Sequence, residues 1–175
     1  ISVIDNTEEL SQLLQTTDKN INIGIRIASE ESPQFTFYTS RLGIRYKDIV
    51  PFFKEEIKSD PRVNLTMLHF FINTGINDNS YYWSELTKCL DVYSELKKIN
   101  PALKSLNIGG GFPIKNSLGF DFDYQYIITE IIKKIKKTCN KNNIMEPDIF
   151  TEFGSFTVGE SGGAIFEVIH QKKLI

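Results

Sequence analysis

The feature that most constrains the fold is a regular alternation between short apolar stretches and longer amphipathic segments. The short stretches have the length and the Val, Ile, Leu and Phe content that favour buried strands. They lie at residues 1–4, 21–28, 63–71, 104–109 and 148–153. Because helix-type segments separate these strands, the sequence predicts a parallel sheet wound in right-handed βαβ units.

The intervening segments carry apolar residues at steps of three and four, which is typical of amphipathic helices. The spacing is clearest at residues 83–96 and 124–135. Polar residues typical of helix starts precede the helices. We expect helices to start at or just after Thr7, Asp48, Ser80 and Asp123. Pro51 is compatible with the helix that Asp48 would cap, because it would lie in the first turn.

A parallel sheet of this kind is either open or part of a closed barrel. A (β/α)8 barrel typically needs about 250 residues, whereas this chain has 175. We therefore expect an α/β fold within a single domain, in which either the sheet is open or residues of a (β/α)8 barrel are missing. The strand-like start and the lack of a turn signal near Ile175 lead us to expect that the fold extends beyond this chain.

The balance of charge argues against nucleic acid as a partner. The chain has 20 basic and 22 acidic residues and a net charge of −2, without the basic face that nucleic-acid binding requires. The basic run at 133–137 alternates with isoleucines, which is typical of the solvated face of an amphipathic helix.

Nothing in the sequence indicates a membrane segment or an export signal. No apolar stretch approaches the length that spans a bilayer, and no leader is visible near Ile1. Cys89 and Cys139 are too few and too far apart for a disulfide framework. We therefore expect a cytoplasmic protein.

Two charged residues are candidates for catalysis because they lie near the C-terminal ends of predicted strands. Residues 21–28 alternate so that the isoleucines share one face and Arg26 lies on the other. If the isoleucines pack against helices, Arg26 faces the barrel interior, near the end where such folds carry their active sites. The same parity makes Glu152 a candidate ion-pair partner for Arg26. The alternatives are an arginine that reaches the barrel rim and an exposed strand-end acid.

A run of three glycines, Gly109, Gly110 and Gly111, stands at the end of the predicted strand 104–109. Glycine costs about 0.5–1 kcal/mol of ordering free energy relative to alanine in a regular element. Three in succession indicate a backbone that another group must approach closely. Successive amides in such a turn form a concave site for an anion such as phosphate, and a tight turn without a ligand is the alternative.

The two histidines, His69 and His170, are too few for a metal site. We expect His69 to be a hydrogen-bonded core residue. Its neighbours Phe70 and Phe71 should point to opposite faces of the strand, because strand side chains alternate.

Taken together and in order, five motifs resemble the family of pyridoxal-phosphate-dependent ornithine, diaminopimelate and arginine decarboxylases, which use an alanine-racemase-like barrel. The resemblance covers nearly the whole chain and is greatest to bacterial biosynthetic arginine decarboxylases. The most specific motif is similar to the family's phosphate loop, LNIGGGFP. The five are IRIA at 25–28, SRLGI at 40–44, LHFFINTG at 68–75, LNIGGGFP at 106–113 and TEFGSF at 151–156.

The resemblance implies a role for each candidate site residue. Glu152 would meet the pyridine nitrogen of the cofactor and keep it protonated, and Arg26 would orient that glutamate. Phe71 occupies the position of the family's ring-stacking histidine. The resemblance also assigns the cofactor phosphate to Thr74, Gly109, Gly110, Gly111, Gly154 and Ser155.

The chain also departs from the family pattern. Phe71 offers an aromatic face but no hydrogen-bonding group. Ser155 stands where the family has an arginine, Phe153 where it commonly has a proline, and Asn73 where it commonly has a glycine. The lysine that carries the cofactor in the family lies on an early barrel strand, and neither it nor the family's C-terminal β-domain has a match in these residues. The resemblance thus implies a partial (β/α)8 barrel of about five βα units, in which residues 1–175 form the C-terminal part of the pyridoxal-phosphate-binding barrel domain. We therefore expect residues 1–175 to be inactive on their own.

By resemblance, the full-length protein is expected to decarboxylate arginine to agmatine and CO2 in polyamine biosynthesis, with pyridoxal 5′-phosphate as cofactor, as a homodimer or higher homo-oligomer. Three alternatives remain open at this point. The substrate could be ornithine, diaminopimelate or carboxynorspermidine; the barrel could bind the cofactor without catalysis; or these residues could be a structural subdomain without a ligand.

Overall fold

The computed structural model describes residues 1–29, 42–72, 75–114, 121–159, 161–163, 165–167 and 169. Within them, one parallel sheet has the strand order β1-β2-β4-β5-β6, and β3 pairs with β2 off this path. The strands are β1 (Ser2–Ile4), β2 (Ile21–Ala28), β3 (Ile44–Arg45), β4 (Val63–His69), β5 (Ser105–Asn107) and β6 (Asp148–Phe150).

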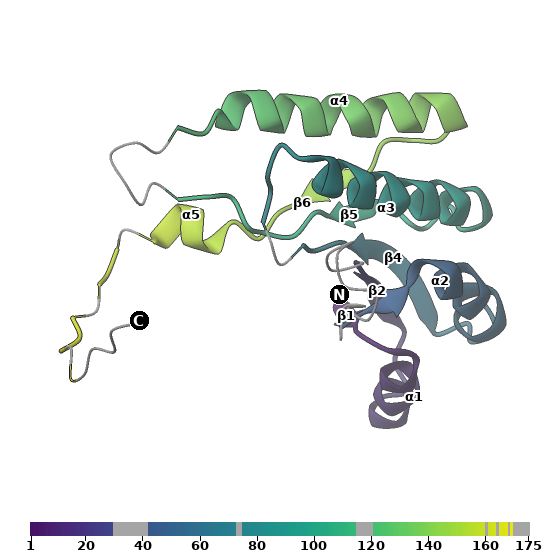
Figure 1. The fold of residues 1–175 in the computed structure, drawn as a ribbon. Helices are drawn as coiled ribbons and strands as arrows, with labels where there is room; N and C mark the ends of the chain where they lie inside the picture. The colour runs from purple at the N-terminus through teal and green to yellow at the C-terminus, as the bar shows by residue number, and fades with distance from the viewer. Residues whose placement is uncertain are drawn as a thin grey trace, which may run out of the picture.

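The helices α1 to α4 follow one another along the same side of the sheet, as Figure 1 shows. Their bounds are α1 (Thr7–Thr16), α2 (Tyr46–Phe52), the π-helix η1 (Phe53–Ile57), α3 (Ser80–Ile99) and α4 (Tyr124–Asn142), and the short α5 (Gly154–Val158) follows β6. A sheet with its helices on one face only is the arrangement of a barrel wall, whereas an open α/β sheet carries helices on both faces. The chain thus forms part of a (β/α)8 barrel.

The register of the sheet separates a helix-facing side from an inner side. Ile25 of β2 pairs with Ile4 on one side and Leu68 on the other, and Leu68 pairs with Leu106. These four side chains are buried in the core between sheet and helices. Strand residues alternate between faces, so Arg26 points to the inner side, as the sequence predicts.

Polar side chains cap three of the helices, although the capping residue is not always the one that the sequence indicates. Asp123 caps α4, as predicted, by accepting from the amide of Tyr126 (2.8 Å). The predicted cap Ser80 is wrong, because Asn79 occupies that position and accepts from the amide of Tyr82 (2.8 Å). Helix α1 begins at Thr7, with Asn6 as its cap. Each observed cap satisfies an amide that the first turn leaves unpaired.

The prediction that Asp48 caps the next helix is also wrong. Helix α2 begins at Tyr46, and Pro51 lies inside it instead of in its first turn. Proline has no amide to donate, which interrupts the regular bonding of a helix. The chain continues after Pro51 as η1, where the amide of Lys58 bonds to the carbonyl of Phe53 (2.9 Å).

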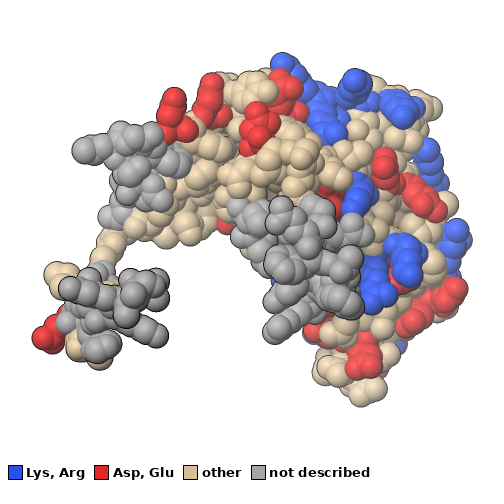
Figure 2. Space-filling view, in the orientation of Figure 1, with Lys and Arg blue, Asp and Glu red and all other residues tan. Residues whose placement is uncertain are grey.

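Charged side chains lie mainly over the helices. Figure 2 shows Lys and Arg interleaved with Asp and Glu on that side of the molecule. Among the described residues, no helix is both long and apolar enough to cross a membrane.

Candidate functional site

The C-terminal ends of the strands bring a row of polar side chains together on the inner side of the sheet. In the register, Arg26 of β2 pairs with His69 of β4, and His69 pairs with Asn107 of β5. Asp5 follows Ile4, which pairs with Ile25, so it adjoins Arg26. Glu152 follows β6 at the other end of the row. The row therefore begins and ends with an acid, with one base and two neutral polar groups between them, at the end of the barrel where active sites lie.

Arg26 lies between an acid and an aromatic ring. Its Nε is 3.8 Å from Asp5 Oδ1, and its guanidinium carbon is 5.6 Å from the centre of the Phe71 ring. The side chain is 22% exposed, so the acid and the ring face stabilise a cation that is largely removed from water. The expected direct ion pair with Glu152 is not formed: within the described residues, Arg26 pairs with Asp5.

Glu152 is held by its backbone and by one of its carboxylate oxygens. Its amide donates to the carbonyl of Gly109 (2.9 Å), and its Oε1 accepts from Asn107 Nδ2 (2.8 Å). His69 Nε2 lies 3.6 Å from the same oxygen, and the side chain is 52% exposed. One edge of the carboxylate is therefore anchored, while much of the side chain stays accessible from the inner side.

His69 is buried, as expected, but the predicted hydrogen bond is wrong. Its Nε2 makes no hydrogen bond in the part of the chain that the structure describes. Burial lowers the pKa of His69 below its usual value, and Arg26 acts in the same direction, while Glu152 and Asp5 oppose it. The imidazole is therefore neutral at neutral pH.

The glycine run is needed first for the packing of the strand ends. Gly109 has a φ of 69°, and a Cβ there would lie 2.7 Å from the carbonyl oxygen of Phe70. A Cβ on Gly110 would overlap the carbonyl oxygen of Glu152. This close backbone approach explains why side chains are absent here, and it also holds Glu152 against the end of β5.

The amides of the run differ in their availability. The amide of Gly109 donates to Asn107 Oδ1 (2.8 Å). Gly110 and Gly111 form no amide hydrogen bond within the described ranges. Gly110 is buried and Gly111 is exposed. Because buried backbone amides are nearly always paired, the amide of Gly110 in particular leaves a donor for an anion, and the amide of Gly111 lies next to it.

The remaining predicted site residues surround this row. Phe71 is half-buried beside Gly109 and beneath Arg26, while Phe70 points the other way into the core, which confirms the predicted opposite orientations. Gly154 and Ser155 begin α5 and are exposed. Asn73, Thr74 and His170, and the first two residues of the SRLGI motif, Ser40 and Arg41, lie outside the described residues.

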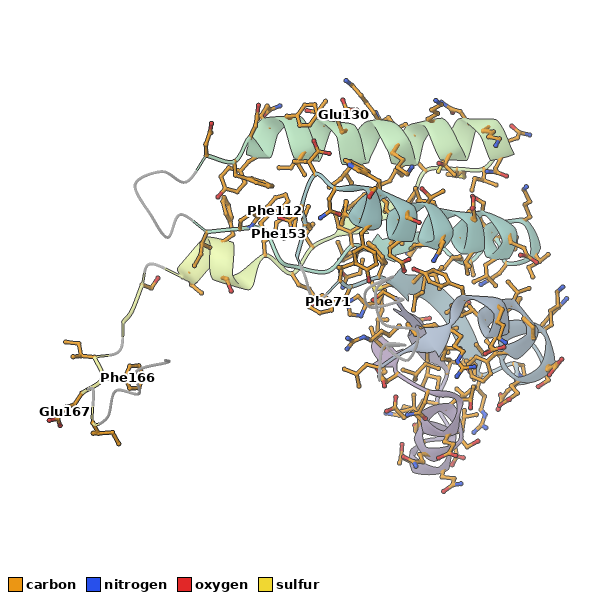
Figure 3. All side chains as sticks on the ribbon, viewed as in Figure 1. Phe71, Phe112, Glu130, Phe153, Phe166 and Glu167 are labelled. Atoms are coloured by element: carbon orange, nitrogen blue, oxygen red, sulfur yellow. The ribbon has the colours of Figure 1, made fainter. Side chains whose placement is uncertain are left out.

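An aromatic cluster fixes the loops that carry the row. Phe112 stacks on Phe153 with ring centres 4.0 Å apart, and Figure 3 shows the two labelled rings side by side. Tyr124 packs edge-on against Phe112 and donates its hydroxyl to the carbonyl of Pro113 (2.6 Å). The turn after β5 and the segment after Glu152 are thus tied to the start of α4.

Two members of the row, Asp5 and Asn107, were not anticipated from the sequence. Asn107 lies two residues before Gly109, at the parity that faces the barrel interior, and Asp5 directly follows a predicted strand. Parity was a usable signal for Asn107, because it also selected Arg26 and Glu152. Within the described residues, no group of three His, Cys, Asp or Glu side chains could hold a metal ion.

The fold and this row define part of a (β/α)8 barrel that carries a set of polar side chains at the C-terminal ends of its strands. Residues 1–159 match the family model described as the pyridoxal binding domain of pyridoxal-dependent decarboxylases. The chain belongs to this family, which confirms the resemblance seen in the motifs.

The curated relatives include biosynthetic arginine decarboxylases. The protein of that name from Prochlorococcus marinus (strain MIT 9215) is 27% identical over 190 residues, covering 97% of this chain and 28% of the relative. Biosynthetic arginine decarboxylase 2 from Synechocystis sp. is 22% identical with the same coverage. The chain therefore spans only 28% of the length of these relatives.

Solved structures of decarboxylases share the fold. Diaminopimelate decarboxylase from M. jannaschii has a TM-score of 0.71 at 19% identity, over 87% of this chain and 37% of that one. Biosynthetic arginine decarboxylase from Campylobacter jejuni has a TM-score of 0.64 at 24% identity, over 88% and 26%. Lysine decarboxylase from Selenomonas ruminantium has a TM-score of 0.69 at 18% identity, over 88% and 38%.

Proposed function

We propose that this chain forms the cofactor-binding part of a pyridoxal-phosphate-dependent decarboxylase that acts on a basic amino acid, with arginine to agmatine and CO2 as the first choice. The observation that carries the proposal is the carboxylate of Glu152, anchored at one oxygen and accessible, beside a glycine turn with two free amides. In this proposal, Glu152 meets the ring nitrogen of the cofactor and the free amides bind its phosphate.

The described residues fit pyridoxal phosphate on their own chemistry. The buried amide of Gly110 needs an acceptor, and an anionic phosphate would supply one that the neighbouring amide of Gly111 can also reach. Ser155 adds its backbone amide and its hydroxyl from the first turn of α5, whereas Gly154 contributes only backbone shape, because its amide donates to the carbonyl of Glu152 (2.7 Å). By resemblance, Gly109 and Thr74 complete the phosphate site, with Gly109 contributing the shape of the turn because its amide is already bonded.

Glu152 and Arg26 have the catalytic roles in this proposal. Bound pyridoxal phosphate supplies an electron sink for the charge left when a carboxylate leaves as CO2. Glu152 keeps the ring nitrogen of the cofactor protonated, which strengthens that sink. Arg26 acts at longer range, since the inner faces of β4 and β5 separate it from Glu152, and its cation favours the neutral form of His69.

Phe71 supplies a face for the cofactor ring. The Phe71 side chain borders Gly109 and lies under the Arg26 guanidinium. An aromatic face stacks on a flat ring without a hydrogen bond, so Phe71 binds and orients but does not transfer a proton.

The choice of arginine is supported by the biosynthetic arginine decarboxylases among the relatives, at 27% identity or similar. Ornithine, diaminopimelate or carboxynorspermidine remain alternatives within the class. A barrel that binds the cofactor without catalysis is the alternative from another class, favoured by phenylalanine at position 71. The proposal includes a cytoplasmic homodimer or higher homo-oligomer and a role in polyamine biosynthesis.

Product release by the full-length protein tests the substrate. Arginine, ornithine, lysine and diaminopimelate are supplied one at a time, with and without pyridoxal phosphate. Cofactor-dependent agmatine from arginine supports the proposal in full. Release of a product from one of the other three amino acids would change the proposed substrate but keep the proposed decarboxylase activity. Inactivity on all four despite cofactor binding supports the non-catalytic barrel.

A further inference from the structure

A buried imidazole nitrogen without a partner lies beside the carboxylate of Glu152. His69 Nε2 is enclosed and makes no hydrogen bond in the described part of the chain. Glu152 Oε1 lies 3.6 Å away, just beyond the usual 2.7–3.2 Å of a nitrogen-to-oxygen hydrogen bond. A buried polar atom left unpaired is destabilising, so a small movement that pairs it is favourable.

Asn107 already supplies one hydrogen-bond donor to Glu152 Oε1. Its Oδ1 accepts from the amide of Gly109 (2.8 Å), and its Nδ2 therefore faces Glu152 Oε1 (2.8 Å). A backbone amide can only donate, so this orientation of the side-chain amide is determined by chemistry. Oε1 thus has one donor in place and a second within reach.

Glu152 is the partner that can move. His69 lies within β4, paired on both sides with Arg26 and Asn107, and its side chain is 11% exposed. Glu152 lies beyond the end of β6 and its side chain is 52% exposed. A rotation of the carboxylate toward β4 closes the distance without disturbing the sheet.

We propose that His69 is a positioning residue for Glu152: its Nε2–H donates to Oε1, and together with Asn107 it fixes the carboxylate so that Oε2 is presented to the ring nitrogen of the cofactor. The inference rests on the proposed function, since it requires a ring nitrogen next to Glu152. His69 itself does not touch the cofactor in this arrangement.

The charges around His69 favour a neutral donor. The titratable and charged groups that face it are Glu152 after β6, Arg26 on β2 and Asp5 after β1. Burial and Arg26 lower the pKa of His69 more than the two acids raise it. A neutral imidazole orients the carboxylate without neutralising its charge, which remains for the ring nitrogen.

The test uses the full-length protein loaded with pyridoxal phosphate carrying ¹⁵N in the ring, whose NMR shift reports whether that nitrogen is protonated. His69→Leu removes the donor at similar volume, and His69→Gln restores an NH donor. We expect the leucine variant to shift toward the unprotonated value and to lose about tenfold in kcat with little change in KM. The glutamine variant should stay near wild type. His69→Asn, with a shorter amide, replaces the leucine variant if the latter does not fold.

The outcomes separate this inference from the function on which it rests. Glu152→Gln is the reference and should move the ¹⁵N shift most. If Glu152→Gln moves it but His69→Leu does not, the role of His69 is overturned. Equal shifts in the leucine and glutamine variants also overturn it, because they indicate a packing role. If Glu152→Gln has no effect on the shift, the contact between Glu152 and the ring nitrogen itself fails.

Discussion

Asn107 and Glu152 follow neighbouring strands and share a 2.8 Å hydrogen bond from the amide Nδ2 to the carboxylate Oε1. The other end of the Asn107 amide is bonded to Gly109. A single side chain thus links the glycine turn to the acidic end of the row. The position of Glu152 depends on this link as much as on its own backbone.

Asn107→Leu should therefore disturb both ends of the link. The amide of Gly109 and the Oε1 atom of Glu152 each lose a partner, and each unpaired group costs about 1–3 kcal/mol where it is buried. We expect a lower free energy of unfolding and at least a tenfold loss of turnover in the full-length protein, measured by urea unfolding and steady-state kinetics. Asn64→Leu, at the exposed start of β4, is the control, and equal effects of both changes would contradict the link.

Gly110→Ala should displace the end of β6. The added Cβ meets the carbonyl oxygen of Glu152, and no side-chain rotation relieves a clash with backbone. We expect a loss of about 2–4 kcal/mol in the free energy of unfolding and weaker binding of pyridoxal phosphate, measured by absorbance titration. Gly163→Ala, which has open space around it, should change neither quantity. An alanine variant that binds the cofactor like wild type would show that the turn is not part of the site.

Acidification should destabilise the protein through His69. Its pKa in the folded state is lowered, mainly by burial, from the usual 6.5, so the unfolded chain binds a proton first as the pH falls. The stability contributed by the neutral imidazole is complete above about pH 6.5 and is lost as the pH falls toward the folded-state pKa. Urea unfolding at several pH values should show a smaller decrease below pH 6.5 in His69→Gln than in wild type. Parallel curves would contradict this linkage.

Phe71→Ala should weaken cofactor binding without unfolding the barrel. The ring is half-buried and provides the face beneath Arg26, and an aromatic contact of this kind contributes about 0.5–1.5 kcal/mol. We expect the dissociation constant of pyridoxal phosphate to rise about 2- to 13-fold. Phe71→Tyr keeps the face and should bind like wild type, as should Phe166→Ala in the exposed tail. Unchanged binding in the alanine variant would remove Phe71 from the site.

The sequence predicts the order of the elements well because apolar patterning reports burial. The bounds of β2 match the prediction, since its alternation begins and ends with the strand. The predictions for β4, β5 and β6 were too long at their C-terminal ends. Phe70 and Phe153 continue the apolar pattern, but they pack against Tyr82 and Phe112 instead of extending the strands. Apolar patterning does not distinguish a residue buried within a strand from one buried against aromatic rings beyond the end of the strand.

The candidate site was predicted only in part, because the sequence pattern shows which face of a strand a residue lies on but not which residues of other strands it meets. Strand parity alone places Arg26 and Glu152 on the inner side. Their indirect connection through His69 and Asn107 depends on the register between strands that lie far apart in the sequence, which periodicity does not supply. The two-residue strand β3 is too short to produce a pattern.

The most direct test of the account is Glu152→Gln in the full-length protein. The glutamine keeps the size of the side chain but cannot hold the ring nitrogen protonated, so pyridoxal phosphate should still bind while turnover falls by about a hundredfold or more. Asp148→Asn, at the other end of the same strand, should leave both unchanged. Retained cofactor binding with this loss of turnover is the predicted result, and unchanged turnover would contradict the role of Glu152.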